Sequence, residues 1–529
     1  MTTAIPGVSF QAAAPAPAPS PLRSDVAGFV GRTRRGPVGV AIRVVGWRGY
    51  EAVFGGLDPR AHTPYAIRGY FENGGQIAYV VRVTGDDAAT AVATWDLSQG
   101  IGVDALRAIG GFEAGRYTVA ATSPGRWARD LRVDAGYQRW GPSGSPQVSL
   151  AVRPVGEPVE HLPGLSPAAL VTEVAARSRY IRLIPGPALT PGPNPGPGPN
   201  AARWQVSGLA LAAPAPSPSQ TGDSAYAAAA LALGDVPEVA LLAFPDLYAD
   251  VAAPVDFLSA QLDEAERLHD RMVVVDPPPE IVSATQDRPG ALAAGLLAKL
   301  AADGVRAARA GALYFPYLLV PDPLAPGRAF GNAPGLRALP ACGHVAGLIS
   351  RLDRERGAHH TPANARLTGA VGLDRMPDRD EQARLIDLGV NLVRCHPRDG
   401  LVVWGGRTLA RAPDRGGFIA HRRLLHRLVR AIRRVAEPLV FETNGPELWL
   451  AFGRAITTVL LSAFRSGALR GARPEQAFRV QCDAETNPVE DRDLGRCLCL
   501  VELAPAAPME FIELRIALSQ DGALEVLVP

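Results

Sequence analysis

Three apolar runs in the middle of the chain each end in a turn, and stretches of helical composition separate them. The runs are VALLAFPD (239–246), RMVVVDPPP (271–279) and ALYFPYLLVPDP (312–323), and the helical stretches cover 256–270 and 289–309. Strands that are apolar on both faces belong in a sheet covered by helices on both sides, and alternation with helices favours parallel pairing. The pattern therefore predicts a mostly parallel sheet within an α/β domain.

A second region has a different period. Between residues 84 and 184 the runs RYTVAAT, RDLRVDAGYQ and QVSLAVRPV alternate apolar and polar residues, which predicts β-strands with one buried face. The Pro-rich runs 185–200 and 213–224 follow and suggest the exit from an inserted domain. Because 529 residues exceed what one hydrophobic core organises, we expect several domains.

The predicted fold class is α/β (α+β across several domains). A central mixed α/β domain carries an inserted β-rich domain and is followed by a C-terminal α/β domain, with extended arms at both ends. Strong helices are expected at 421–434 and 446–465. The expected divisions are an N-terminal arm (1–24), the central domain (25–85 with 222–375), the inserted domain with Pro-rich loops (86–221), the C-terminal domain (376–516) and a C-terminal arm or hairpin strand (517–529).

Both predicted arms are strands without a domain of their own. IPGVSF places Val8 and Phe10 on one face, and AAAPAPAPSP behind it is an extended tether because proline fixes φ. Such a strand satisfies its backbone groups by joining the edge of another sheet. At the other end, ALEVLV can fold back on FIELRIAL through Asp521-Gly522 or can be donated to a neighbour. The candidate inter-subunit residues are Val8, Phe10, Leu524, Val526 and Val528.

Charge and cysteine content exclude several classes of protein. The formal net charge of +2 indicates neither a nucleic-acid-binding nor a membrane-binding protein. Five scattered cysteines do not form a disulfide framework, and MTTAIPGVSF lacks the regions of a secretory signal. The apolar stretch 225–247 is interrupted by Asp235, Pro237 and Glu238 and is not expected to span a membrane. We expect a soluble protein that folds in a reducing cytoplasm.

No motif in the chain carries recognisable chemistry. In IRGYFENGGQIAYVVRV (67–83) the glycines lie between a helix and a strand, the reverse of a phosphate-binding loop, so we interpret them as a helix cap and turn. Lys299, the single lysine, precedes Leu300 and forms no Walker A motif. His359-His360 lacks nearby ligands for a metal, and Cys497 and Cys499 fit a buried strand face. We predict no catalytic, cofactor-binding or metal-binding residue.

One helix is unusually basic. HRRLLHRLVRAIRR (421–434) has an apolar stripe, arginines over the rest of its surface and no acid. Two interpretations stay open, a solvated surface helix and a helix that docks on an acidic partner. Nucleic acid is a weaker third option, because the aromatic residues expected for stacking on bases are missing.

Several motifs, in order along nearly the whole chain, resemble the contractile tail sheath family of phage tails, R-type pyocins and extracellular contractile injection systems. The first is VAGFVGRTRRGPVGVAIRVVGWRGYEAVFGG followed by YAIRGYFENGGQIAYVVRV. Later ones are TVAATSPGRWARDLRV, ALGDVPEVALLAFPD, CGHVAGLISRLDRERGAHHTPAN, GVNLVRCHPRDGLVVWGGRTLA and PLVFETNGPELW.

The resemblance implies a structural subunit, not an enzyme. Such subunits polymerise helically in rings of six around an inner tube, contact baseplate and terminal cap proteins, and contract to drive the tube through a target membrane. It also implies arms that add strands to neighbouring C-terminal domains, an outermost inserted domain, and no cofactor, nucleic acid or membrane insertion. A helix of the C-terminal domain contacts the tube in this family, so the tube-facing candidates are Arg422, Arg423, Arg427, Arg430 and Arg434.

The resemblance further implies assembly in the cytoplasm into a phage tail or tail-like particle, with extracellular release as an open alternative. Two competing hypotheses remain. One is a non-polymerising baseplate-type component of the same apparatus, against which the two terminal arms argue. The other is an α/β enzyme with an unrecognised site at its sheet edge.

Overall fold

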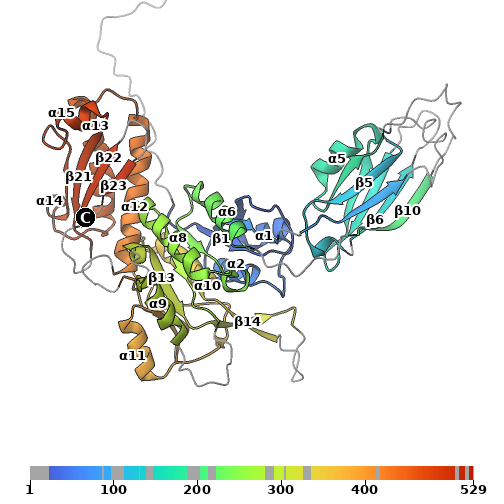
Figure 1. Ribbon diagram of the computed structural model, residues 1–529, viewed down its shortest axis with the longest axis horizontal. Coiled ribbons are helices and arrows are strands. Elements are labelled where there is room, and N and C mark those ends of the chain that lie inside the picture. The colour runs from blue at the N-terminus through green and yellow to red at the C-terminus, as the bar shows by residue number, and fades with distance from the viewer. Residues whose placement is uncertain are drawn as a thin grey trace, which may run out of the picture.

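The computed structural model describes most of the chain as three bodies, shown side by side in Figure 1. The described residues are 23–85, 88–96, 112, 114–129, 131–138, 147–187, 203–212, 222–279, 291–302, 306–325, 335–410, 417–506, 512–518 and 524–527.

The central body is built on a nine-stranded sheet. Its five inner pairings, from β3 through β1, β11, β12 and β13 to β18, are parallel, and antiparallel strands close both ends. This confirms the predicted mostly parallel sheet. The strand order is β16 (Ala365–Arg366), β19 (Gly400–Trp404), β18 (Asn391–His396), β13 (Gly311–Phe315), β12 (Met272–Val275), β11 (Leu241–Ala243), β1 (Ala27–Gly31), β3 (Ile77–Arg82) and β2 (Ile42–Val45).

Helices cover both faces of this sheet, because its strands are apolar on both sides. Phe29 and Val30 are neighbours in β1 but belong to different hydrophobic clusters, as do Val80 and Val81 in β3. One cluster includes side chains of α1 (Gly46–Phe54), α2 (Thr63–Glu72) and α10 (Cys342–Glu355). The other includes side chains of α6 (Asp223–Gly234), α7 (Leu247–Asp250), α8 (Pro254–Leu268), α9 (Ala291–Ala302), η3 (Arg306–Ala310) and α11 (Arg379–Asp387).

Helices α2 and α10 approach each other at glycines. A Cβ atom on Gly343 would lie 2.2 Å from the carbonyl oxygen of Ala66, and one on Gly347 would lie 2.3 Å from that of Tyr70. After α2, Gly74 has a φ of +102°, and its N–H donates to Phe71 O at 3.1 Å. The Asn73-Gly74-Gly75 segment therefore ends a helix and turns the chain, as predicted.

The inserted body contains two antiparallel sheets around one hydrophobic cluster. The strand of residues around Trp204 pairs with β6 at the edge of the larger sheet. The larger sheet has the order β10 (Arg203–Ala210), β6 (Arg132–Gln138), β7 (Gln147–Arg153) and β8 (Glu160–Leu165); the smaller has β4 (Val92–Asp96), β5 (Arg116–Ala121) and β9 (Ile181–Pro185), with η1 (Arg126–Ala128), η2 (Pro167–Ala169) and α5 (Leu170–Arg177) beside them.

The C-terminal body packs α12 (Ile419–Ala436) and α13 (Pro446–Arg465) with a four-stranded sheet. Within the described residues, α13 is the one helix long and apolar enough to cross a membrane, and five of its side chains are buried in this body. The sheet order is β20 (Phe478–Gln481), β21 (Cys497–Leu503), β22 (Ile512–Leu518) and β23 (Leu524–Leu527), accompanied by η5 (Glu437–Leu439), α14 (Pro474–Ala477) and α15 (Val489–Asp493).

Two sequence-based expectations about the elements were wrong. The run at 312–323 is not one strand, because Pro316 separates β13 from β14 (Leu318–Asp322); β14 joins a small sheet with β15 (Gly335–Leu339) and β17 (Gly372–Leu373). The boundary drawn at 376 also cuts the central sheet, since α11, β18 and β19 follow it in sequence and belong to that body. Alternating α and β signals continue smoothly there, so periodicity alone contained no sign of the true edge.

Candidate functional site

Helix α12 lies where the C-terminal body meets the central body (Figure 1). Its apolar stripe of Leu424, Leu425, Leu428, Val429 and Ile432 is buried in the C-terminal cluster, as the sequence predicted. Its remaining surface carries six arginines, and three of these are also buried. We therefore take the arginine-rich face of α12 as the starting point for a functional site.

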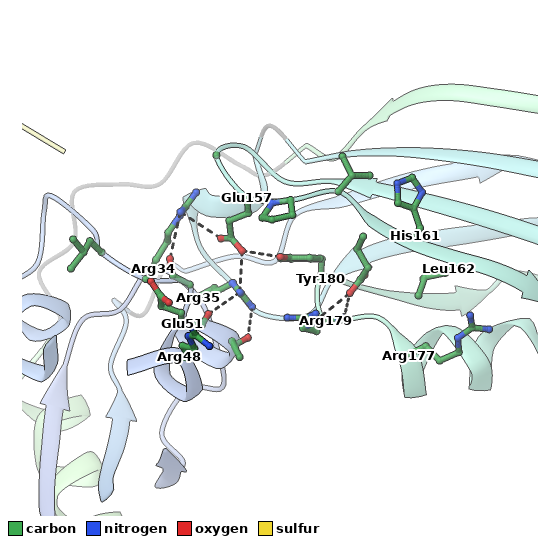
Figure 2. A pocket seen from close by; sticks show the side chains of 18 of the residues that line it. Arg34, Arg35, Arg48, Glu51, Glu157, His161, Leu162, Arg177, Arg179 and Tyr180 are labelled. Carbon is green, nitrogen blue, oxygen red and sulfur yellow. Dashed lines mark hydrogen bonds and ion pairs between the residues drawn. The ribbon is translucent and has the colours of Figure 1, made fainter. Parts of the chain in front are cut away.

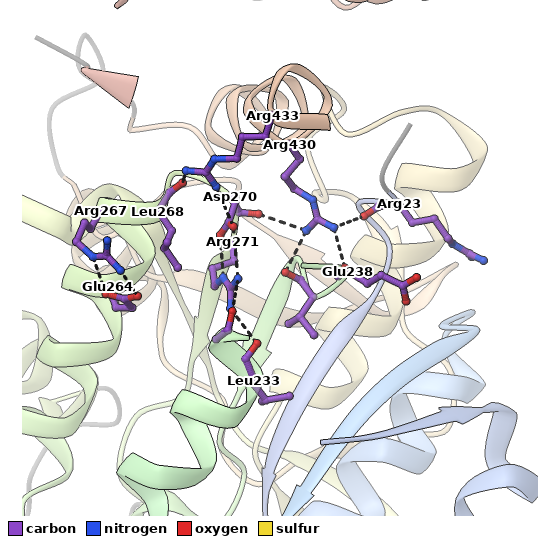
Figure 3. Close-up of polar contacts among 12 residues, drawn as sticks. Arg23, Leu233, Glu238, Glu264, Arg267, Leu268, Asp270, Arg271, Arg430 and Arg433 are labelled. Atoms are coloured by element: carbon purple, nitrogen blue, oxygen red, sulfur yellow. Dashed lines mark hydrogen bonds and ion pairs between the residues drawn. The ribbon is translucent and has the colours of Figure 1, made fainter. Parts of the chain in front are cut away.

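Arg430 is the centre of this interface, with 2% of its surface exposed. Figure 3 shows its guanidinium among backbone carbonyls of the central body. Nη1 donates to Val239 O at 3.0 Å and Asp270 O at 3.4 Å, and Nη2 donates to Arg23 O and Glu238 O, both at 2.8 Å. These carbonyls precede β1, β11 and β12, so one side chain holds the amino ends of three adjacent strands.

Asp270 links a second arginine of α12 to the same edge (Figure 3). Its carboxylate accepts hydrogen bonds from Arg433 Nη1 at 3.1 Å and from Arg271 Nε at 2.8 Å. Arg433 also donates to Leu268 O at 2.5 Å, and Arg271 donates to Leu233 O at 3.1 Å. The ends of α6, α8 and α12 are thus joined through one carboxylate.

Arg422 and Arg423 pair with acids that are remote in sequence. Arg422 donates to the Glu266 carboxylate of α8 and contacts His269 Nδ1 at 3.0 Å. Arg423 donates to the Asp353 carboxylate of α10. All of these arginines are therefore used inside the chain, although α12 itself contains no acid.

Burial shifts the pKa values of several ionisable groups at this interface. It lowers the pKa of Arg422 and of Arg430 to about 10, so both remain charged at neutral pH. Burial, together with surrounding arginines, also lowers the pKa of His426 well below its usual value, which keeps that imidazole neutral. For Asp353, burial raises the pKa while Arg423 opposes the shift.

The interpretation of 421–434 as a solvated surface helix was wrong, and three of the five tube-facing candidates need correction. Arg422, Arg423 and Arg430 are each less than 5% exposed and are bound to the central body. Helical periodicity identified their face but not the acids and carbonyls that cover it, which come from far away in the sequence. The signals in the sequence were the acids of 256–270 and Asp353, and their spacing did not indicate that they pair with α12.

The other two tube-facing candidates, Arg427 and Arg434, are at least partly accessible to solvent. Arg427 is half-buried and Arg434 is exposed, and both line a cavity of about 410 Å³ between α12 and α13. The rest of its lining is mainly apolar: Leu424, Leu428, Ala431, Val435, Ala455, Val459, Ala463 and Ala468, with Thr458, Ser462, Ser466 and His359.

The arm residues are only partly described. Val8, Phe10 and Val528 lie outside the described residues. Leu524 and Val526 lie in β23, opposite Leu518 and Ile516 of β22 in an antiparallel pairing. The C-terminal segment thus forms the hairpin within the subunit, one of the two alternatives left open by the sequence.

The carboxyl ends of the central strands, where open α/β sheets bind ligands, are closed by the protein's own acids. Asp246, which follows β11, is 1% exposed and accepts from His62 N at 2.6 Å and Thr63 Oγ1 at 2.7 Å at the start of α2. Asp276, which follows β12, accepts from Cys342 N at 3.0 Å at the start of α10. Carboxylates thus fill the helix N-termini where a substrate anion could bind. An acid three residues after β11 and an acid directly after β12 were the signals available in the sequence.

A second set of polar contacts joins the inserted body to the central body (Figure 2). Glu157 accepts from Arg35 Nη2 at 3.2 Å and from Tyr180 OH at 2.8 Å, and it pairs with Arg34 at 3.5 Å. Arg34 also donates to Val155 O at 2.7 Å. The sequence did not single out these residues, which we call the Glu157 clamp; they border a polar cleft of about 960 Å³.

Other residues considered for chemistry show no constellation that would support it. In the described part of the chain, no group of three or more His, Cys, Asp or Glu side chains is arranged to hold a metal ion. The His359 and His360 rings lie 4.4 Å apart. Cys497 and Cys499 are both buried on one face of β21, as predicted.

Comparison with known proteins identifies the fold and a family domain. The model of the phage tail sheath protein central domain matches residues 307–409, which include β13, α10, β18 and β19. The tail sheath protein of Vibrio phage KVP40 is 27% identical over 190 residues, which are 35% of this chain and 27% of that protein. The matched region therefore spans little more than a quarter of that relative.

Two solved structures cover nearly the whole chain. The sheath tail protein from Listeria innocua superposes with a TM-score of 0.62 at 10% identity, over 94% of this chain and 96% of the other. The helical sheath of the anti-feeding prophage in its contracted state gives a TM-score of 0.52 at 21% identity, over 97% and 98%. The chain thus has the sheath-protein fold and carries the family's central domain. The predicted resemblance to contractile tail sheath proteins is confirmed.

The first prediction concerns the interface centre. Arg430→Gln removes a buried guanidinium and leaves carbonyl oxygens without donors, so we expect a loss of about 3 kcal/mol in the free energy of unfolding. Arg434→Gln, the same change on the exposed side of α12, should alter it by less than about 0.5 kcal/mol. Denaturant unfolding followed by tryptophan fluorescence measures both, and equal effects would contradict the role given to Arg430.

The second prediction concerns Asp276. Burial raises the pKa of this carboxyl to about 7 in the folded chain, against about 3.9 in an unfolded one. The stability supplied by its protonated form is present below about pH 4 and is lost as pH rises through 7. Asp276→Asn keeps an oxygen to accept from Cys342 N and cannot ionise. We therefore expect the variant's stability advantage over the parent protein to increase from about 1.5 kcal/mol at pH 5 to about 4 kcal/mol at pH 8.

The control for this prediction is Asp263→Asn, an exposed change on α8. It should show no pH-dependent difference from the parent protein. Denaturant titrations at pH 5 and pH 8 measure the free energy of unfolding of each variant. The same difference from the parent protein at both pH values for Asp276→Asn would contradict the ionisation argument.

Proposed function

We propose that this chain is the subunit of a contractile sheath that polymerises helically, in rings of six, around an inner tube and contracts to drive the tube through a target membrane. The observation that carries the proposal is the likeness to sheath proteins over nearly the whole chain, including one in a contracted helical sheath. Its partners are further copies, the inner tube, and baseplate and terminal cap proteins. It assembles in the cytoplasm and functions in a phage tail or tail-like particle.

The contacts described above suit a rigid-body transition. The α12 interface joins the C-terminal and central bodies, and the Glu157 clamp joins the inserted body to them, so each subunit can rotate as a unit. A free-energy difference of only a few kcal/mol per subunit, summed along a polymer, is a large total. No nucleotide is needed, and the strand ends where one could bind are filled by Asp246 and Asp276.

Strand donation provides the connections between neighbouring subunits. The C-terminal sheet ends in β20 on one side and β23 on the other, and both present an edge to which a strand can add. Residues 4–10 of a neighbour supply such a strand. In the assembled state, β23 with Leu524 and Val526 is either retained or exchanged between subunits.

Arg427 and Arg434 are the remaining candidates for tube contact. The other three candidates are bound to the central body, whereas Arg427 is half-buried, Arg434 is exposed, and both line the cavity between α12 and α13. Acidic groups on the tube would pair with them in the extended sheath and separate from them on contraction.

A baseplate-type component of the same apparatus is the alternative function, and an α/β enzyme is the more remote one. The closed strand ends argue against the enzyme. Self-assembly separates the other two, because a baseplate component has no reason to form a long helical polymer.

Assembly is tested by negative-stain electron microscopy of the purified chain. We expect hollow, regularly striated tubes, formed by the chain alone or with the tube protein co-expressed. Deleting residues 1–20 should abolish them, since the neighbour's strand is lost. A chain that stays monomeric at high concentration under both conditions contradicts the proposal.

Tube contact is tested by charge reversal. Arg427→Glu with Arg434→Glu should weaken co-sedimentation with the tube protein by about tenfold or more, because attraction becomes repulsion. Arg454→Glu, an exposed change on α13, is the matched control and should leave binding unaltered. Unchanged binding by the double variant would exclude these arginines from the contact.

A further inference from the structure

The cavity between α12 and α13 has the character of a binding site for an apolar segment. Its volume of about 410 Å³ lies in the range of sites that bury ligands. Leu424, Leu428 and Val435 line it from α12, and Val459 and Ala463 line it from α13. None of the described residues fills it. Arg427 and Arg434 also line it, so a mainly apolar cavity carries two basic side chains in its wall.

The described part of the chain begins at this same helix. Arg423 donates to Ser24 O and Arg430 donates to Arg23 O, both at 2.8 Å. Arg427 is three residues before Arg430 on α12, and residues at this spacing are about 5–6 Å apart on a helix surface. Arg23, which follows residues 1–22, is therefore bound to the helix that lines the cavity, by a side chain one helical turn from Arg427.

The composition of residues 1–22 fits the cavity. This segment contains no charged side chain, and Ile5, Val8 and Phe10 are grouped near its start. The twelve residues 11–22 between this group and Arg23 are rich in Ala and Pro. At about 3.1 Å per residue they reach up to about 37 Å, more than the length of about 27 Å of the 18-residue helix α12.

We propose that Ile5, Val8 and Phe10 dock in the α12–α13 cavity of their own chain while the subunit is free. A tether of this length gives its own segment an effective concentration near the millimolar range. A neighbour's segment in dilute solution is present only at micromolar concentration. The chain's own segment therefore occupies the cavity in preference to a neighbour's. The docked segment also covers Arg427 and Arg434; this one consequence rests on the proposed tube contact.

The test uses chymotrypsin on the full-length chain. Phe10 is the single aromatic residue in 1–22, so cleavage after it reports directly on the segment. At about 1 µM chain we expect cleavage about tenfold slower than in a synthetic peptide of residues 1–22. Mass spectrometry of the released N-terminal fragment gives the rate. Equal rates in chain and peptide would overturn the proposal.

Variants separate docking from other causes of protection. Ile5→Asp with Val8→Asp should restore the rate of the peptide that carries the same changes, without touching the folded bodies. Ala12→Asp with Ala16→Asp places the same charges in the tether and should keep the protection. Val459→Glu should abolish protection from the cavity side, with folding checked by circular dichroism. Protection that survives both the segment and the cavity variants overturns the proposal.

A concentration series identifies the occupant. Protection by the chain's own segment is the same at about 1 and 50 µM, whereas protection by a second copy increases with concentration. An increase would therefore overturn the proposal in favour of exchange between copies. The experiment contains no tube protein and no polymer, so its outcome is separate from that of the sheath assembly test.

Discussion

The guanidinium of Arg430 is the contact on which the arrangement of the central and C-terminal bodies depends. A cation removed from water is costly unless its donors find acceptors, and here four carbonyl oxygens of the central body accept from its two Nη groups. A shift of α12 along the central body would leave these buried groups without partners. This free-energy cost makes the interface specific. Helix α12 docks in the one position that places Arg430 at the amino ends of β1, β11 and β12. Asp246 and Asp276 make corresponding contacts at the carboxyl ends of β11 and β12. Polar contacts therefore fix the central strands at both of their ends.

The inserted body depends on fewer contacts. Arg35 is almost completely buried and connects the helix α1 region to Glu157, while Tyr180 approaches the same carboxylate from the inserted body. This body has its own hydrophobic cluster. It can therefore vary in size or surface while the central and C-terminal bodies keep the contacts on which the proposed assembly relies.

Sequence periodicity predicted elements well and their partners poorly. The helix expected at 446–465 has those bounds, and the strand expected within 271–279 is β12, because apolar spacing and turn residues act locally. The boundary at 376 was misplaced because the chain returns to the central sheet after an interval with no local mark. The arginines of α12 were misassigned for the same reason. Their acidic partners Glu266 and Asp353 lie 156 and 70 residues away, and only the folded chain brings them together.

Both ends of the described chain reach the C-terminal body. Arg23 and Ser24 are bound by α12, and β23 completes the sheet that packs with that helix. In a polymer connected through its chain ends, tension between subunits would pass through this small body. The nine-stranded sheet would lie beside that path, not along it. Under load, α12 and the C-terminal strands would then separate or unfold first. The central sheet would still be folded when the subunit detaches from the particle.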